Sequence, residues 1–198
     1  MVVPSGAAPV LDGSLTEDSW AGALATPVGD GLTLMWLHDG DMLFLGSRHS
    51  RRGSVNLWVA DGDRVRVLHS SAALGSASYQ RQSDGTWQLE HGFDWCCRSG
   101  GDTESLDALW AAEGWVASIG TIGTRGEVEF RVDIRAETRV AVSWVGPTGD
   151  AVTWPADLPE AEAASLYGVP ADIGSFHPEW WPLLQYETGI SGIPALTP

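Results

Sequence analysis

Residues 127–134 indicate the fold class, because they read EVEFRVDI and alternate charged with apolar side chains over the whole stretch. An alternation with a period of two is typical of a β-strand that has one buried face and one wet face. A sheet of such strands needs a second layer to cover its apolar side. The stretch therefore predicts a layered β-protein.

Similar short runs lie on both sides of this stretch, separated by turns. Asp39-Gly40-Asp41 and Asp61-Gly62-Asp63 each predict a hairpin, because Asp-Gly tolerates the positive φ of a tight reversal. Regular turn signals between short strands favour an all-β fold, a two-sheet antiparallel β-sandwich. The predicted strands are residues 32–37, 42–46, 55–59, 65–68, 77–81, 87–96, 115–119, 128–134 and 140–145.

Helical patterns are few and short. Ser14 and Glu17 have capping-box spacing before Trp20, which predicts one or two helical turns. Residues 103–113 and 159–166 predict two further short helices, each followed by a glycine that can end it.

The C-terminal part of the chain has a different composition. Five prolines and several aromatic side chains interrupt any regular period, which predicts an irregular extension packed on the sandwich. We therefore predict one domain over residues 1–167 and an extension over residues 168–198. The residues that set the extension apart are Pro170, His177, Pro178, Trp180, Trp181, Pro182, Tyr186, Pro194 and Pro198.

The charge of the chain argues against two classes of partner. The formal net charge is -15, from 26 acidic and 11 basic residues, and every basic residue is arginine. Such a field repels phosphate backbones and anionic lipids, so we expect neither nucleic acid nor a membrane as partner. The N-terminus has no basic region followed by an apolar run, so we expect no signal peptide and a cytoplasmic protein.

The only cysteines, Cys96 and Cys97, are adjacent in the sequence. A vicinal bridge, a metal site or a redox role are alternatives for this pair. We favour two ordinary small residues on a strand, one facing inward and one outward.

Catalytic motifs are missing from the sequence. It contains no His-Glu-x-x-His, no Gly-x-Ser-x-Gly, no phosphate-binding glycine loop and no Cys-x-x-Cys. Glycosidases need two carboxylates across the sugar, but with 26 acidic residues some pair always exists. We expect a protein that is not an enzyme.

An ordered set of motifs resembles the family 9 carbohydrate-binding modules and their DOMON-like relatives. These motifs are residues 9–20 with Asp12-Gly13 and Trp20, residues 32–45, residues 53–59, residues 126–134, and residues 153–155. The resemblance implies two packed antiparallel sheets of the jelly-roll type. It also implies a non-catalytic domain that binds carbohydrate or another polar small molecule.

The resemblance also implies candidate ligand residues. Two tryptophans clamp a terminal sugar in sugar-binding members, because the apolar faces of a pyranose stack on aromatic rings. Trp154 matches one clamp position, whereas the other falls just before Gly53, in an arginine-rich loop without a tryptophan. Asn56 stands where the family has a glutamate, and Arg66 lies near a hydroxyl-binding arginine. The predicted ligand residues are Trp154, Asn56, Arg66 and Arg48.

Alternatives concern cofactors and assembly. We expect no cofactor, although the two Asp-Gly-Asp turns offer oxygens for calcium without the spacing of a dedicated loop. Haem binding is a further alternative. A second function is a protein-interaction domain that forms homo-oligomers through its aromatic tail. The haem alternative would use Met35 or Met42 with His38, His49, His69 or His91.

Overall fold

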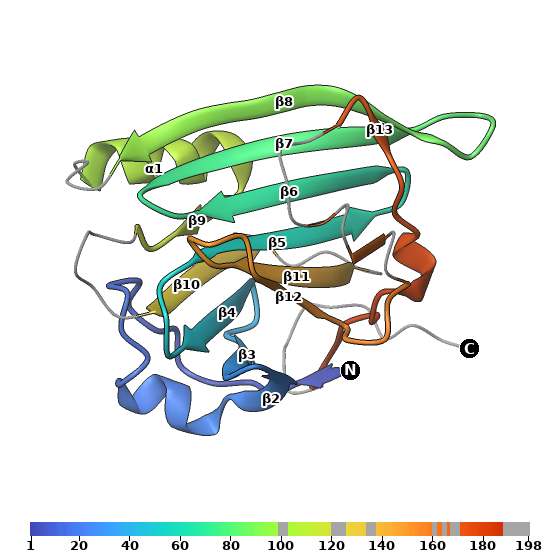
Figure 1. The fold of residues 1–198 in the computed structure, drawn as a ribbon. Helices are drawn as coiled ribbons and strands as arrows, with labels where there is room; N and C mark the ends of the chain where they lie inside the picture. The colour runs from blue at the N-terminus through green and yellow to red at the C-terminus, as the bar shows by residue number, and fades with distance from the viewer. Residues whose placement is uncertain are drawn as a thin grey trace.

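Two antiparallel sheets face each other across a hydrophobic core, which confirms the predicted β-sandwich (Figure 1). The computed structural model describes residues 1–98, 103–119, 126–133, 138–159, 162–163, 166 and 171–187. Among these residues, no helix is long and apolar enough to cross a membrane.

The smaller sheet has five strands in the order β2-β3-β4-β10-β9. The larger sheet has seven, in the order β12-β11-β5-β6-β7-β8-β13. The strands of the smaller sheet are β2 (Leu24–Gly29), β3 (Leu32–His38), β4 (Met42–His49), β9 (Trp115–Ala117) and β10 (Gly126–Asp133). Those of the larger sheet are β5 (Ser54–Asp61), β6 (Arg64–Ser70), β7 (Ala73–Arg81), β8 (Trp87–Arg98), β11 (Arg139–Val145), β12 (Ala151–Trp154) and β13 (Ile173–Gly174).

Alternate residues of the central strands form the core between the sheets. In β10, Val128, Phe130 and Val132 lie in this core, as the period of two predicts. Four tryptophans that lie in or beside strand-like runs of the sequence are also buried: Trp20, Trp36, Trp87 and Trp115.

A parallel pair of short strands, β1 (Val2–Val3) and β14 (Gln185–Tyr186), lies outside both sheets. Helix α1 (Thr103–Glu113) has the predicted bounds and packs against β8 and β9. The predicted helix at residues 14–20 is instead a 3₁₀ turn, η1 (Asp18–Gly22), whose N-cap Glu17 makes no side-chain capping bond. The helix predicted at residues 159–166 falls largely outside the described residues.

C-terminal residues pack on the outer face of the seven-stranded sheet and form a partial third layer. Phe176 contacts the rings of Trp58, Tyr79, Trp87 and Trp181. Trp181 is 1% exposed, whereas its neighbour Trp180, in the short 3₁₀ helix η2 (Pro178–Trp180), is 50% exposed. The two tail tryptophans therefore have different roles, and only Trp181 fastens the chain to the sheet.

Candidate functional site

One row of residues crosses the outer face of the seven-stranded sheet at the same level on neighbouring strands. Ser143 lies opposite Asn56, Asn56 opposite His69, His69 opposite Gly75, and Gly75 opposite Trp95. Directly opposed residues share a face of the sheet. The row therefore begins with three polar side chains and ends on an indole.

Hydrogen bonds link the polar part of the row, and their directions follow from the bond that Ser143 donates to a carbonyl. Ser143 donates through Oγ to the Leu166 carbonyl at 2.6 Å, so its oxygen accepts from Asn56 Nδ2 at 3.0 Å. Asn56 Oδ1 lies 2.7 Å from His69 Nδ1. Because an amide oxygen only accepts, His69 carries its proton on Nδ1 and its Nε2 accepts from the Ser71 hydroxyl at 2.9 Å.

His69 is a neutral support in this row. Burial lowers the pKa of His69 to about 4, since its charged form would lose hydration. Both ring nitrogens already have partners within the protein. The ring therefore orients its neighbours and is unsuited to proton transfer near neutral pH.

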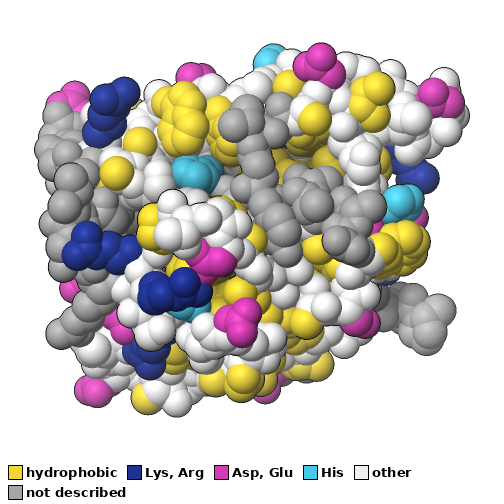
Figure 2. All heavy atoms as spheres, in the orientation of Figure 1, with side chains coloured by type: hydrophobic (Ala, Val, Ile, Leu, Met, Phe, Trp, Pro, Cys, Tyr) yellow, Lys and Arg dark blue, Asp and Glu magenta, His cyan; other side chains and the backbone are white. Residues whose placement is uncertain are grey.

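Trp95 forms an exposed aromatic platform at the end of the row. Its side chain is 54% exposed, and a Cβ added at Gly75 would lie 2.8 Å from its Cε3 atom. A glycine inside a strand allows this close approach. The Phe93 ring lies 5.0 Å away at 31°, and the His69 ring lies edge-on at 5.2 Å. Figure 2 shows hydrophobic side chains next to a histidine on this face, toward the left end of β8.

Directly after Trp95, the structure joins Cys96 and Cys97 in a disulfide. Our interpretation of them as separate side chains, one inward and one outward, is therefore wrong. Cys96 pairs with Leu74 and Arg98 pairs with Ala73, so Cys97 is an extra residue in β8. Its φ of 40° lies in the left-handed region, as in a β-bulge. The Cys97 Sγ atom lies 3.4 Å from the Ser105 carbonyl of α1.

A shallow depression of about 340 Å³ lies beside the indole. Its lining combines an aromatic face, a guanidinium and a hydroxyl, which can stack on a ligand and hydrogen-bond to its polar groups. We define the Trp95 site as Ser71, Phe93, Trp95 and Arg98, with His69 and Asn56 as supporting residues. The depression itself is lined by Ser71, Ala72, Ala73, Trp95 and Arg98.

The residues predicted to bind ligand do not share a pocket. Asn56 lies on the outer face, where it is 4% exposed and supports His69. Trp154 lies opposite Val142, a core residue, so it faces inward, and its ring packs 5.1 Å from that of Trp36. Contact of Trp154 with a ligand stays a prediction.

Arg66 lies opposite Val59 on the inner face of the sheet, away from Asn56. Its Nη1 donates to the Glu113 carbonyl at 2.9 Å. This bond satisfies a carbonyl at the C-terminal end of α1, where the helix leaves its last carbonyls without partners. Arg66 thus holds the helix on the sheet, and a ligand role for it stays a prediction.

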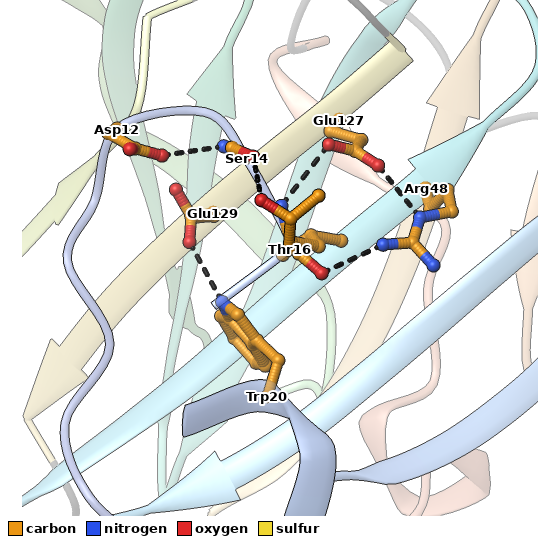
Figure 3. A network of polar contacts seen from close by, with 8 residues as sticks. Asp12, Ser14, Thr16, Trp20, Arg48, Glu127 and Glu129 are labelled. Atoms are coloured by element: carbon orange, nitrogen blue, oxygen red, sulfur yellow. Dashed lines mark hydrogen bonds and ion pairs between the residues drawn. The ribbon is translucent and has the colours of Figure 1, made fainter. Parts of the chain in front are cut away.

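Arg48 fastens the N-terminal segment to the five-stranded sheet (Figure 3). Its Nε lies 2.8 Å from Glu127 Oε1, and its Nη2 donates to the Leu15 carbonyl at 2.9 Å. Glu127 also accepts the backbone N–H of Leu15 at 3.2 Å. In this position Arg48 is a structural residue, and its binding of a ligand stays a prediction.

Glu129 makes the buried half of the same network. It is fully buried and accepts the N–H of Gly13 at 2.7 Å. It also accepts the Nε1–H of Trp20 at 3.0 Å (Figure 3). Burial raises the pKa of Glu129 to about 7 despite these two bonds. Glu129, in the motif at residues 126–134, thus hydrogen-bonds to Gly13 and Trp20 in the motif at residues 9–20. These bonds give both motifs a structural role.

The turns considered for calcium have hairpin geometry. Asp39 Oδ1 accepts the backbone N–H groups of Asp41 and Met42, as in an Asx turn. Within the described ranges, no group of three or more His, Cys, Asp and Glu residues lies together in a way that could hold a metal ion. Met35 and Met42, considered for haem, pack against the hydrophobic cluster of Leu15, Trp20, Leu37 and Phe44.

The Trp95 site was not predicted from the sequence. Two features of the sequence point to it: the aromatic-acid-aromatic order of Phe93, Asp94 and Trp95, and Gly75 inside the β7 run. Neither shows which strands lie side by side.

Comparison with known proteins supports the fold. No protein-family model matches the chain, and no curated protein matches it. One similar structure is a family 9 carbohydrate-binding module from Caldicellulosiruptor kristjanssonii in complex with cellotriose. It has a TM-score of 0.52 and 9% identity, over 100% of this chain and 98% of that one.

A second similar structure is a proposed carbohydrate-binding protein from Bacteroides uniformis. It has a TM-score of 0.52 and 12% identity, over 94% of this chain and 98% of that one. At these identities the likeness shows the fold alone: a sandwich like that of the family 9 carbohydrate-binding modules.

Proposed function

We propose that this protein binds carbohydrate at the Trp95 site and does not act on it chemically. The observation that carries the proposal is the half-exposed indole, which lies over Gly75 beside Ser71 and Arg98. A pyranose ring has apolar C–H faces that stack on an indole and hydroxyls at its edge that need polar partners.

The surroundings of the indole favour a preformed platform. Phe93 and His69 contact the Trp95 ring from the sides, and the hydrogen bonds of His69 fix that imidazole. A platform that is already ordered loses less side-chain entropy when a ligand binds. An ordered platform therefore favours the binding of a saccharide, whose individual contacts are weak.

The comparisons give the proposal a second line of support. The Caldicellulosiruptor kristjanssonii module has this fold and was solved with cellotriose. A non-catalytic role is consistent with the lining of the depression, since its five residues include no carboxylate. Glycosidases need a pair of carboxyl groups across the bond they cleave.

The test is a glycan array followed by calorimetric titration of the oligosaccharide that binds most tightly. Trp95→Ala should weaken binding at least about tenfold, or about 1.4 kcal/mol, because the stacking surface is lost. Trp180→Ala is the matched control, since Trp180 is 50% exposed but lies in the C-terminal extension. The absence of any saccharide ligand, or equal effects of both variants, would overturn the proposal.

A further inference from the structure

The position of Arg98 depends on the bulge at the end of β8. In a regular strand, residues three apart point to opposite faces, so Arg98 would face away from Trp95. The pairing of Trp95 with Gly75 and of Arg98 with Ala73 puts both side chains on one face. The extra residue, Cys97, shifts the alternation by one position and so moves Arg98 to the face that carries Trp95.

The disulfide fits the bulge and does not fit a regular strand. Neighbouring side chains in a regular strand project to opposite faces, which keeps two adjacent sulfur atoms apart. The Cys96–Cys97 bond is compatible only with a chain that departs from this alternation, as the positive φ of Cys97 does. A side chain other than glycine rarely adopts that φ unless its surroundings impose it.

Arg98 is available to a ligand at this position. Its side chain is exposed and lines the depression with Trp95 and Ser71. Among the described residues, no acidic side chain forms an ion pair with it. A guanidinium offers five N–H donors in a planar array, which suits pairs of hydroxyls or a carboxylate at the edge of a stacked sugar.

We infer that the Cys96–Cys97 disulfide positions Arg98 as a second ligand-binding side chain of the Trp95 site, so that saccharide binding depends on the redox state of the two cysteines. The inference rests on the proposed function. A dithiol reductant opens the bond: two electrons and two protons pass to the protein, which gains two thiols, while the dithiol becomes a disulfide. The reduced Cys97 can then leave its positive φ, and Arg98 turns away from the platform.

The experiment combines calorimetric titration with NMR on the full chain, with and without dithiothreitol. The probes are cellotriose and the oligosaccharide that binds most tightly on the array. We expect reduction to weaken binding about tenfold, and Arg98→Ala to weaken it equally in the oxidised protein. Reduction of the Arg98→Ala variant should cause no further loss, because the disulfide acts through Arg98.

A variant with both Cys96→Ser and Cys97→Ser should bind saccharide with the affinity of the reduced protein, and dithiothreitol should not change that affinity. NMR adds a readout that needs no saccharide. Nuclear Overhauser contacts between Ala73 and Arg98 should be present in the oxidised protein and lost on reduction. Arg98→Lys keeps the charge but not the planar donors, so it should recover only part of the affinity.

The outcomes separate this inference from the proposed function. Binding that needs Trp95 but is unchanged by reduction or by Arg98→Ala overturns the inference and leaves the proposed function intact. Persistence of the Ala73–Arg98 contacts in reduced protein also overturns it. If no saccharide binds, the proposed function fails and the ligand role of Arg98 fails with it. Loss of the Ala73–Arg98 contacts on reduction would still support the conclusion that the disulfide stabilises the bulge.

Discussion

Gly75 shows how one missing side chain determines what lies on a sheet surface. The Trp95 ring occupies the space that a Cβ at residue 75 would need. Gly75→Ala should lift the ring from the sheet and weaken saccharide binding several-fold, while the free energy of unfolding changes by less than about 1 kcal/mol. Calorimetric titration and urea unfolding measure the two effects. Unchanged affinity in a folded variant would show that the ring position is unimportant.

Glu129 should make stability depend on pH. A folded Glu129 keeps its proton up to about pH 7, whereas the ordinary pKa is 4.5, so the folded state binds more protons between these values. Its contribution is therefore fully present below about pH 4.5 and is lost as the pH rises through about 7. The slope is at most about 1.4 kcal/mol per pH unit.

Glu129→Gln tests this dependence, because glutamine does not titrate and can accept only one of the two N–H groups. We expect a loss of about 1–3 kcal/mol at pH 5 and a smaller loss at pH 8. Urea unfolding at both pH values gives the difference. Glu90→Gln, at an exposed carboxylate on β8, is the control and should cost less than about 1 kcal/mol at pH 5. A loss that is equal at both pH values would contradict the raised pKa.

His69 should make stability depend on pH in the direction opposite to Glu129. Burial lowers its pKa from 6.5 to about 4, so its contribution is present above pH 6.5 and is lost as the pH falls toward 4. Nitrogen-15 NMR of the imidazole groups should show the Nδ1–H tautomer of His69 and no protonation at pH 5.5. The exposed His91 serves as a reference in the same spectrum. An Nε2–H tautomer would reverse the assigned direction of the hydrogen bonds from Ser143 to Ser71.

Single residues were the least predictable part of the molecule. Alternation correctly places Val128 and Phe130 in the core, because it depends only on neighbours in the sequence. The Trp95 site depends on register, since Gly75 and Trp95 are far apart in the sequence and meet through pairing of β7 with β8. Arg66 shows the same limit, since only pairing with Val59 puts it on the face opposite Asn56.

Elements were predicted better than residues. All nine predicted strands are present, although several extend further, as β4 does to His49. The predictions missed β2, which contains Pro27 and ends at Gly29, because both residues normally argue against a strand. No strand was predicted at Trp154, although this residue ends the edge strand β12. At Ser14 the predicted capping box is replaced by a bond from its Oγ to that of Thr16.

The C-terminal layer allows a test with two adjacent tryptophans. Trp181 is buried against Trp58 and Phe176, and its Nε1–H donates to Glu162 at 2.9 Å. Trp181→Ala should lower the free energy of unfolding by about 3–5 kcal/mol, because it leaves a cavity and a buried carboxylate without this donor. Trp180→Ala, at the half-exposed neighbour, should cost less than about 1 kcal/mol. If urea unfolding shows similar losses for the two variants, the packing of Trp181 as part of a third layer would be contradicted.

At the scale of the whole molecule, the pairing of β1 with β14 brings residues from the two ends of the sequence together. The Met1 ammonium group donates to the Leu183 carbonyl at 2.8 Å, and the N–H of Gln185 donates to the Met1 carbonyl at 2.8 Å. Val2 lies beside Gln185 and Val3 beside Tyr186. The path of the chain from residue 1 to residue 187 is therefore almost a closed loop.

A closed loop can be opened elsewhere. A circular permutant of residues 1–187 that links residue 187 to residue 1 and starts within residues 82–86, the turn between β7 and β8, keeps every strand beside its present neighbours. Its circular dichroism spectrum should match that of the parent chain, and its saccharide binding should be retained. Failure to fold would mean that the β7–β8 turn is needed to form the sheet. Success would give new chain ends on a different part of the surface, where a fused protein would leave the β1–β14 pair undisturbed.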